Sequence, residues 1–299
     1  MELTAGKTAV VTGAGSGIGL ALADRFARSG LNVVLADVEA QALQDATERI
    51  EAHGARALAV RTDVSDEQAV QALAEATLGH FGAVHVVCNN AGVASRADPW
   101  FGPTSAWNWV LGVNLWGVIH GVRAFLPHLV AGGEGHIVNT ASMAGLYPGV
   151  GPPYDASKHA VVALTEDLYT TLRLAGLPVG VSVLCPGWVR TNILDAGRNW
   201  PEHMGQRPDD SAAHEFLIPY VQRAIDEGTP PAAVADLVAA AVEGEQFWIF
   251  TESQFQEMAI RRWHSIAEGR NPDIEAEVPG FPAAKELAAE IQRLLASGA

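Results

Sequence analysis

Short runs of β-branched and other apolar residues alternate with helical patterns along most of the 299-residue chain. Between the first two runs, Ile18, Leu22 and Phe26 recur every four residues, which is the spacing of one helix face. Strands that are apolar throughout and are separated by helices are typical of a parallel sheet covered on both faces. Strands are predicted at residues 8–13, 32–37, 57–63, 84–90, 136–142, 179–187 and 246–250.

This alternation predicts one α/β domain spanning residues 1–299, a Rossmann-type doubly wound parallel sheet with helices on both faces and a core at about 5–250. Residues 192–228 are polar, contain proline and look irregular, which predicts a lid over a site. Residues from about 251 to 299 form a C-terminal extension, for which packing and an oligomer contact both remain open. Further helices are predicted at 39–53, 66–79, 107–130 and 154–174, and after Thr229 as N-cap and Pro230 as first helical residue.

The net charge of the chain is −15, from 34 acidic and 19 basic residues. This sign disfavours surfaces that neutralise nucleic-acid phosphates or anionic lipid, so we expect neither a nucleic-acid nor a membrane partner. The sequence MELTAGKTAVVTG lacks the basic and apolar regions of a secretory signal, and no apolar run is read as a membrane span. A cytoplasmic location is therefore predicted.

Metal-binding residues do not form a recognisable pattern in this chain. Its ten histidines include no HxxxH or HExxH pairing, and the two cysteines are far apart and lie in apolar runs. We expect no bound metal, and we expect Cys88 and Cys185 to be buried reduced thiols.

A glycine-rich segment, TGAGSGIG, follows the first predicted strand and opens a helix. It fails the strict GxGxxG fingerprint but matches a GxxxGxG spacing through Gly13, Gly17 and Gly19. Glycines in this strand-turn-helix context let the backbone approach a pyrophosphate at a helix N-terminus, although glycines also serve tight turns.

Asp37 ends the second predicted strand, 18 residues beyond Gly19. A carboxylate at this place can bind the ribose 2′-hydroxyl of a nucleotide and repels a 2′-phosphate; the alternative is that it caps the next helix. No arginine or lysine follows Asp37 directly, and position 16 is serine. NAD is therefore favoured over NADP.

Tyr154 and Lys158 lie four residues apart at the predicted start of a helix, in PPYDASKHA. Residues at this spacing share one helix face, but such a pair also arises by chance. Its weight depends on the motifs around it.

These motifs together resemble the short-chain dehydrogenase/reductase family, in the branch with TGxxxGxG and YxxxK. The resemblance covers residues 5 to about 250 and follows the order of the family's motifs. The matching segments are TGAGSGIG, Asp63-Val64, Asn89-Asn90-Ala91-Gly92, Asn114 in VNLWG, Ser142 in NTASMAG, Tyr154 and Lys158 in YDASK, and PGWVRT at 186–191.

The resemblance implies four catalytic residues. Tyr154 would be the general acid/base and Ser142 would hold the substrate oxygen, while Lys158 would bind the nicotinamide ribose and Asn114 would hold a water linked to Lys158. Because a free phenol has a pKa of about 10, Tyr154 needs Lys158 and the oxidised nicotinamide to favour the phenolate. Thr140 is the alternative to Ser142.

The resemblance also implies the residues that bind the cofactor. For three of them a structural role is also possible: Asn114 could bridge a helix kink, Asn90 could tie neighbouring strands, and Thr191 could be a helix N-cap. The cofactor-binding set is Gly13, Ser16, Gly17, Ile18, Gly19, Asp37, Asp63, Val64, Asn90, Ala91, Gly92, Tyr154, Lys158, Pro186, Gly187, Val189 and Thr191.

The predicted function is an NAD-dependent oxidoreductase that interconverts a secondary alcohol and a ketone. A large apolar pocket, which would suit a bulky apolar or aromatic substrate, is predicted from Met143, Leu146, Tyr147, Trp188 and Trp200. Trp107, Trp109 and Trp116 are assigned instead to the core or a subunit face. The alternative is a catalytically silent NAD-binding sensor, which would predict damage to the four catalytic positions. A homodimer or homotetramer is expected from the resemblance.

Overall fold

The computed structural model describes residues 1–149, 151–272 and 281–296, so parts of the predicted C-terminal extension (273–280 and 297–299) lie outside the described residues. Its strands form one parallel sheet in the order β3-β2-β1-β4-β5-β6-β7. The strands are β1 (Thr8–Thr12), β2 (Asn32–Asp37), β3 (Ala57–Arg61), β4 (Val86–Asn89), β5 (Gly135–Thr140), β6 (Val179–Cys185) and β7 (Trp248–Phe250). The prediction of a Rossmann-type doubly wound sheet is confirmed.

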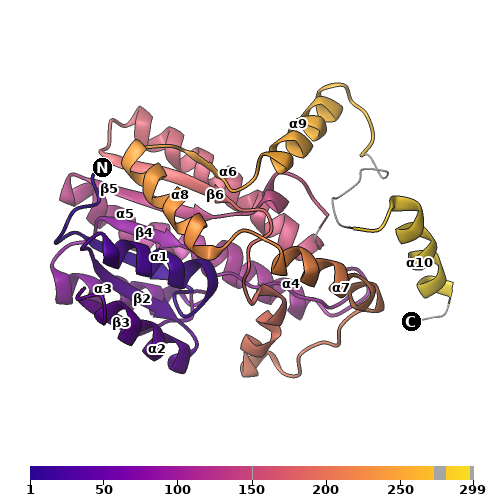
Figure 1. Ribbon diagram of the computed structural model, residues 1–299, viewed down its shortest axis with the longest axis horizontal. Coiled ribbons are helices and arrows are strands. Elements are labelled where there is room, and N and C mark those ends of the chain that lie inside the picture. The colour runs from indigo at the N-terminus through magenta and orange to yellow at the C-terminus, as the bar shows by residue number, and fades with distance from the viewer. Residues whose placement is uncertain (150, 273–280, 297–299) are drawn as a thin grey trace.

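Helices cover both faces of this sheet (Figure 1). The helices of one face are α1 (Gly17–Arg28), α2 (Ala40–Glu51) and α8 (Pro231–Gly244), and those of the other are α3 (Glu67–Phe81), α5 (Gly117–Gly132) and α6 (Pro152–Leu174). Helix α4 (Ser105–Leu111) contacts α6, and its buried Trp109 and Val110 belong to a third, smaller cluster. Alternate strand residues feed two separate cores, because successive side chains of a strand point to opposite faces. Val10 and Val34 belong to the core under α3, α5 and α6, whereas Val11 and Val33 belong to the core under α1, α2 and α8.

Residues 192–228, between β6 and α8, lie over the carboxyl edge of the sheet. The segment predicted as an irregular lid contains η3 (Ile193–Asn199), η4 (Glu202–Met204) and the 15-residue helix α7 (Ala212–Asp226). The lid is therefore more regular than predicted. The Ser211 hydroxyl accepts a hydrogen bond from the His214 amide at 3.3 Å and so caps the N-terminus of α7. Helix α7 forms although it contains Pro219, one of the prolines for which the segment was predicted to be irregular.

Two helix boundaries differ from the predicted ones. Helix α8 begins one residue later than predicted, with Pro230 as N-cap and Pro231 as first helical residue. The predicted helix at 107–130 is interrupted by one π-helical turn, η1 (Gly112–Trp116), which contains Asn114. By length and composition, Ser105–Gly132 passes as a possible membrane span, contrary to the sequence reading, but more than half of its apolar window is buried inside the protein. A mostly buried stretch of this kind is also what the core helix of a soluble protein presents.

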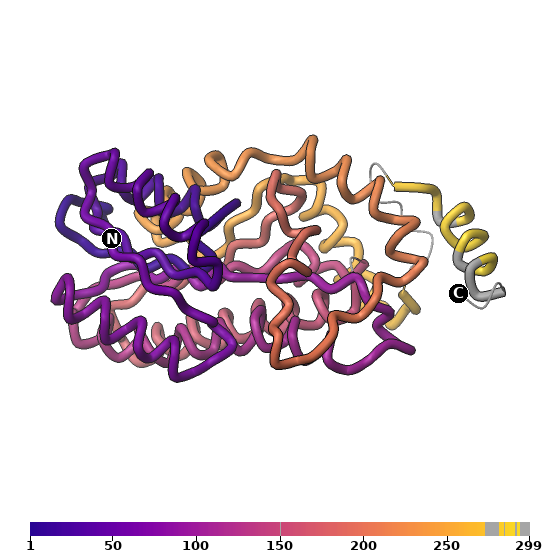
Figure 2. Tube along the Cα trace, turned by 90° about the horizontal axis from the view of Figure 1, so that it is seen from below, coloured from indigo at the N-terminus to yellow at the C-terminus, as the bar shows by residue number. Residues whose placement is uncertain are grey.

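The C-terminal elements lie beside the sheet rather than on it. They are α9 (Ser253–Ala267) and α10 (Ala284–Ala296). Helix α10 lies at the end of the molecule remote from the N-terminus (Figure 2) and contacts α7. Phe281 precedes α10 and stacks on Trp188, with 5.7 Å between ring centroids and 19° between ring planes.

Candidate active site

A cleft opens at the carboxyl edge of the sheet, where the ends of six strands contribute to its wall. The contributing residues are Gly13 after β1, Asp37 at the end of β2, Asp63 after β3, Asn90 after β4, Ser142 after β5 and Pro186 after β6. The strand order reverses between β1 and β4, and the crevice at such a switch point is where open α/β sheets bind ligands.

The glycine loop forms one wall of the cleft and starts α1. Gly13 has a φ of +67°, and a Cβ there would lie 2.9 Å from the Ala91 Cα. A Cβ on Gly19 would lie 2.0 Å from the Gly13 carbonyl oxygen, so Gly19 permits close packing although it does not line the cleft. The first N–H groups of α1, as in any α-helix, have no intrahelical partner. Ser16, which precedes α1 in extended conformation, does not cap them with its side chain. This backbone suits the pyrophosphate of a dinucleotide.

Asp37 lies against the same loop. Its Oδ2 accepts a hydrogen bond from the Gly15 amide at 2.8 Å, and its Oδ1 accepts one from the Glu39 amide at 3.0 Å. The N-cap of α2 is Glu39, so Asp37 does not occupy the capping position that was its alternative role. Asp37 lines the cleft at the end of β2, where a nucleotide ribose would meet it.

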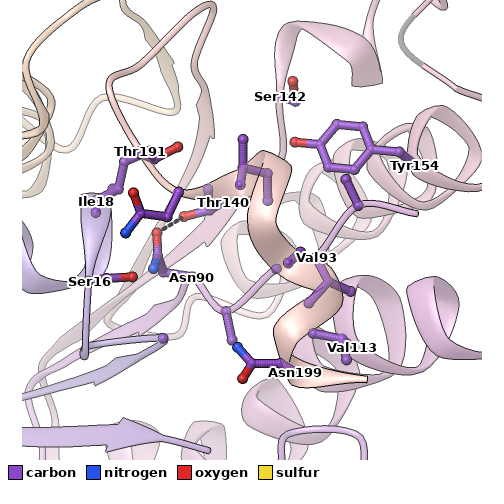
Figure 3. A pocket seen from close by; sticks show the side chains of 18 of the residues that line it. Ser16, Ile18, Asn90, Val93, Val113, Thr140, Ser142, Tyr154, Thr191 and Asn199 are labelled. Atoms are coloured by element: carbon purple, nitrogen blue, oxygen red, sulfur yellow. Dashed lines mark hydrogen bonds between the residues drawn. The ribbon is translucent and has the colours of Figure 1, made fainter. Parts of the chain in front are cut away.

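Tyr154 stands in the first turn of α6 and faces Ser142. The two prolines before it, Pro152 and Pro153, belong to the helix and occupy its first positions, where a missing N–H costs nothing. The Tyr154 hydroxyl points toward Ser142 (Figure 3). Burial raises the pKa of Tyr154 to about 12, and the hydrogen bond with Ser142 acts in the opposite direction. The protein's own groups therefore favour the neutral phenol, and the shift toward the phenolate that is expected from the oxidised nicotinamide stays a prediction.

Lys158 lies one helical turn beyond Tyr154 and is buried. Its Nζ donates to the Thr140 carbonyl at 2.9 Å and lies 5.5 Å from the centroid of the Tyr154 ring. Burial lowers the pKa of Lys158 to about 8. Near neutral pH the ammonium is thus close to its titration range, which suits a group that takes part in proton exchange.

Asn114 lies behind the cleft, in the π-helical turn η1. Its Oδ1 accepts from the Val93 amide at 2.8 Å, and its Nδ2 donates to the Val93 carbonyl at 3.0 Å and to the Ser157 hydroxyl at 3.1 Å. A Cβ on Gly92 would lie 3.5 Å from Asn114 Oδ1 and 3.6 Å from Lys158 Nζ. Asn114 therefore joins the loop at Gly92 and Val93 to α6, which differs from the alternative of bridging a helix kink, because these side-chain hydrogen bonds leave its own helix. Its role in a water relay stays a prediction.

Two further predicted residues have clear positions. Asn90 ties three strands. Its backbone N–H donates to the Thr12 hydroxyl at 2.9 Å, and its Nδ2 donates to the Thr12 carbonyl at 3.0 Å. Its Oδ1 accepts from the Thr140 hydroxyl at 3.3 Å (Figure 3). Thr191 lies against the glycine loop, 3.1 Å from the position of a Gly17 Cβ, and is not a helix N-cap, since Asn192 precedes η3. The other predicted cofactor residues that line the cleft are Ile18, Asp63, Val64, Ala91, Gly92, Pro186, Gly187 and Val189.

The predicted substrate pocket is only partly assembled. Trp188 lines the cleft, but Met143, Leu146, Tyr147 and Trp200 do not. Met143 is turned into the core beside α6, and Tyr147 packs against the same core. Trp200 packs edge-on against Trp109, with 5.2 Å between ring centroids, and thereby holds the lid. Aromatic residues near a site were a weak signal, because apolar side chains serve the core equally well.

Several lining residues were not predicted from the sequence. Trp109, which was assigned to packing, is buried and also reaches the cleft wall. The additional lining residues include Val93, Val113, Ile193, Leu194, Ala196, Val221 and Ile225, which are apolar, and Glu39, Arg198 and Asn199, which are polar. Only the assignment of residues 192–228 to a lid indicated some of them. Within the described part of the chain, no group of three metal-ligating side chains is found.

The comparisons with known proteins agree with this geometry. A sequence profile of the family described as "short chain dehydrogenase" matches residues 7–202, about two thirds of the chain. The chain belongs to the short-chain dehydrogenase family. It is therefore an oxidoreductase of a family that uses nicotinamide cofactors, and the glycine loop, Asp37 and Lys158 all line the same cleft.

Relatives of this short-chain dehydrogenase include enzymes named for hydroxylated substrates. The chain is 40% identical over 257 residues to a 1-deoxy-11-beta-hydroxypentalenate dehydrogenase of Streptomyces avermitilis, which covers 84% of this chain and 86% of the relative. It is 38% identical over 202 residues to a 2-(R)-hydroxypropyl-CoM dehydrogenase of Xanthobacter autotrophicus, covering 66% and 80%. A short-chain dehydrogenase/reductase from Burkholderia phymatum, solved in complex with NAD, is 43% identical with a TM-score of 0.89 and covers 93% of this chain and 100% of its own.

Proposed function

We propose that the protein is an NAD-dependent dehydrogenase that interconverts a secondary alcohol and a ketone, with Tyr154 as general acid/base. The observation that carries the proposal is the meeting of Ser142, Tyr154 and Lys158 in one cleft whose other end holds Asp37. The names of the Streptomyces and Xanthobacter relatives, which both specify hydroxylated substrates, support alcohol chemistry.

The side chains divide the work at the alcohol oxygen. The Ser142 hydroxyl holds the substrate oxygen. When the alcohol is oxidised, Tyr154 acts as the phenolate, which the nearby Lys158 ammonium and the positive nicotinamide of bound NAD would favour, and takes the hydroxyl proton; when a ketone is reduced, it acts as the phenol and donates that proton. Bound NAD supplies the acceptor for the hydride that leaves the carbinol carbon. Lys158, fixed by the Thr140 carbonyl, orients the nicotinamide ribose and carries the proton onward, and Asn114 fixes the Gly92 loop behind it.

NAD rather than NADP is favoured by the carboxylate of Asp37 at the end of β2. Its two oxygens accept hydrogen bonds from the backbone amides of Gly15 and Glu39, and these bonds hold the carboxylate in place at this end of the cleft. A ribose hydroxyl can donate to such a carboxylate, whereas a 2′-phosphate would be repelled. The NAD-bound neighbour from Burkholderia phymatum supports the same choice.

The substrate is proposed to be bulky and apolar or aromatic. The wall on the Tyr154 side carries Val93 and Val113 (Figure 3), while Trp188, Val221 and Ile225 come from the β6 end and α7. A mostly apolar wall with a few polar groups is what pockets for small organic ligands contain. The preference predicts that activity rises with the apolar size of the alcohol.

The test is a scan of secondary alcohols with NAD and with NADP, which follows the absorbance of the reduced cofactor. Turnover that is faster with NAD and with larger apolar alcohols supports the proposal. Tight NAD binding without turnover of any alcohol or ketone would instead favour the sensor, and turnover with NADP alone would overturn the cofactor assignment. The Tyr154→Phe variant, which keeps the ring and loses the hydroxyl, is the matched control for turnover by this cleft.

The cell location and assembly are proposed from weaker observations. Both cysteines are free and buried, which suits a reducing cytoplasm. Trp116 on η1 leaves about half of its side-chain surface exposed, at 53%, and a homodimer or homotetramer would give it cover. Analytical ultracentrifugation of the wild type and of Trp116→Ala would test the assembly, because a monomeric wild type contradicts it.

A further inference from the structure

An ion pair joins the lid to the loop after β2 across the cleft. Oε1 of Glu39 accepts hydrogen bonds from Arg198 Nη2 at 2.8 Å and from Arg198 Nε at 3.1 Å. The same oxygen accepts a third, at 2.8 Å, from Asn199 Nδ2. All three residues line the cleft, and Glu39 and Arg198 are 159 positions apart in the sequence.

This ion pair lies at the end of the cleft that holds Asp37. The Glu39 amide donates to Asp37 Oδ1 at 3.0 Å, so the two acidic residues adjoin. Among the described residues that line the cleft, the lysine and arginine side chains are Lys158 and Arg198. Lys158 is bonded to Thr140 beside Tyr154, which leaves Arg198 as the cation at the Asp37 end.

Arg198 is anchored in such a way that the loss of Glu39 would free part of its guanidinium. Its Nη1 donates to the main-chain carbonyls of Asp195 at 2.8 Å and of Asn192 at 3.3 Å, within the lid itself. Nε and Nη2, the other edge of the fork, are the atoms that Glu39 occupies. That edge has the geometry that binds a phosphate through two parallel hydrogen bonds.

We infer that Glu39 is a second cofactor-specificity residue. It occupies the Nε and Nη2 atoms of Arg198, so this guanidinium is not free to bind the 2′-phosphate of NADP. The inference rests on the proposed function, in which a nicotinamide dinucleotide lies in this cleft with its adenosine ribose toward Asp37. Glu39 and Arg198 expose only 31% and 30% of their side chains, so the ion pair is partly shielded from solvent.

The charge state of Glu39 fits this role. Burial alone would raise the pKa of its carboxyl, but the hydrogen bonds from Asn199 and Arg198 outweigh burial and lower the pKa below its usual value. Glu39 is therefore a carboxylate at neutral pH, and it pairs with the guanidinium under the conditions in which cofactor binds.

The test is equilibrium binding of NADH and NADPH, followed by nicotinamide fluorescence, to the full chain and its variants. Glu39→Ala should tighten NADPH binding by about tenfold, the scale of one charge-assisted hydrogen bond, and change NADH binding by much less. Glu39→Gln keeps a hydrogen-bond acceptor and should give a smaller gain. Adding Arg198→Ala to Glu39→Ala should abolish the gain, because the freed guanidinium is its source.

Controls separate this mechanism from general effects of charge and of the lid. Asp236→Asn removes another carboxylate that binds an arginine, Arg25, at 2.9 Å, remote from the cleft, and should change neither affinity. A gain for NADPH that survives in the double variant, or equal shifts for both cofactors, would overturn the inference alone. A wild type that binds neither dinucleotide would overturn the proposed function and this inference with it.

Discussion

The Nζ atom of Lys158 lies 5.5 Å from the centroid of the Tyr154 ring and is fixed by a 2.9 Å hydrogen bond to the Thr140 carbonyl. Thr140 ends β5, and Ser142 follows two residues later, so one strand end fixes the lysine and also delivers the serine. Helix α6 contributes the tyrosine and the lysine one turn apart. The proposed catalytic residues thus meet at a junction between one helix and one strand, which keeps their geometry rigid.

Tyr154→Phe should reduce turnover at least about a hundredfold, because general acid/base catalysis contributes on that scale or more. The ring remains, so NADH binding should be almost unchanged. Steady-state kinetics and NADH fluorescence titration give the two readouts. An active variant would contradict the role of Tyr154, and a variant that loses NADH binding as well would show a structural effect instead.

Lys158 should make the stability of the protein depend on pH. Its pKa is about 8 in the folded protein, where burial disfavours the ammonium, and about 10.4 in an unfolded chain. Between these values the unfolded chain binds more protons, so the free energy of unfolding should rise with pH from about 8 to 10, by up to about 2 kcal/mol.

Denaturant titrations at several pH values would measure this rise. Lys158→Met keeps an unbranched side chain without the charge, so the rise in the free energy of unfolding that is due to Lys158 should be absent from this variant. A parallel pH profile for the variant and the wild type would show that Lys158 does not titrate in this range. Tyr154, whose pKa is raised to about 12, would lower stability only above about pH 10, outside the window compared.

Asp37→Ala should reduce the preference for NAD over NADP by about tenfold or more, because the carboxylate that accepts ribose hydroxyl bonds and repels a 2′-phosphate is removed. The ratio of kcat/KM for the two cofactors is the measurement. Asp37 also accepts from Gly15, so the alanine loosens the glycine loop, and the ratio matters more than either value. An unchanged ratio would contradict the ribose role.

Gly121→Ala should destabilise the fold strongly, by several kcal/mol, because overpacking in a tight core forces backbone shifts. A Cβ at Gly121 on α5 would lie 1.9 Å from Asn89 Oδ1, which belongs to β4. Gly79→Ala on α3 is the matched control. Apart from its chain neighbours and the backbone of its own helix, no heavy atom of the described residues lies within 4 Å of its Cβ position, so alanine there should raise the free energy of unfolding by about 0.5–1 kcal/mol.

Urea denaturation of the two alanine variants gives both values in one experiment. The two substitutions are chemically identical and both stand in helices that cover the same face of the sheet. Equal effects at the two positions would contradict the packing of α5 against β4.

The sequence alone determined the sheet and the glycine loop, which follow from local rules: apolar runs form buried strands, and glycines mark close backbone approach. A local rule also places Tyr154 and Lys158 on one helix face, but it was the ordered set of family motifs that singled out this pair and Ser142. Such rules act over a few residues, so they can be read along the chain.

Tertiary structure decided what depends on distant partners. The ion pair of Glu39 and Arg198 joins residues 159 positions apart, and neither residue type marks a cleft by itself. The burial of Met143 and the packing of Trp200 on Trp109 likewise depend on which apolar residues find neighbours in space. The pKa of Tyr154 is raised because burial, which the whole fold sets, outweighs the hydrogen bond with Ser142.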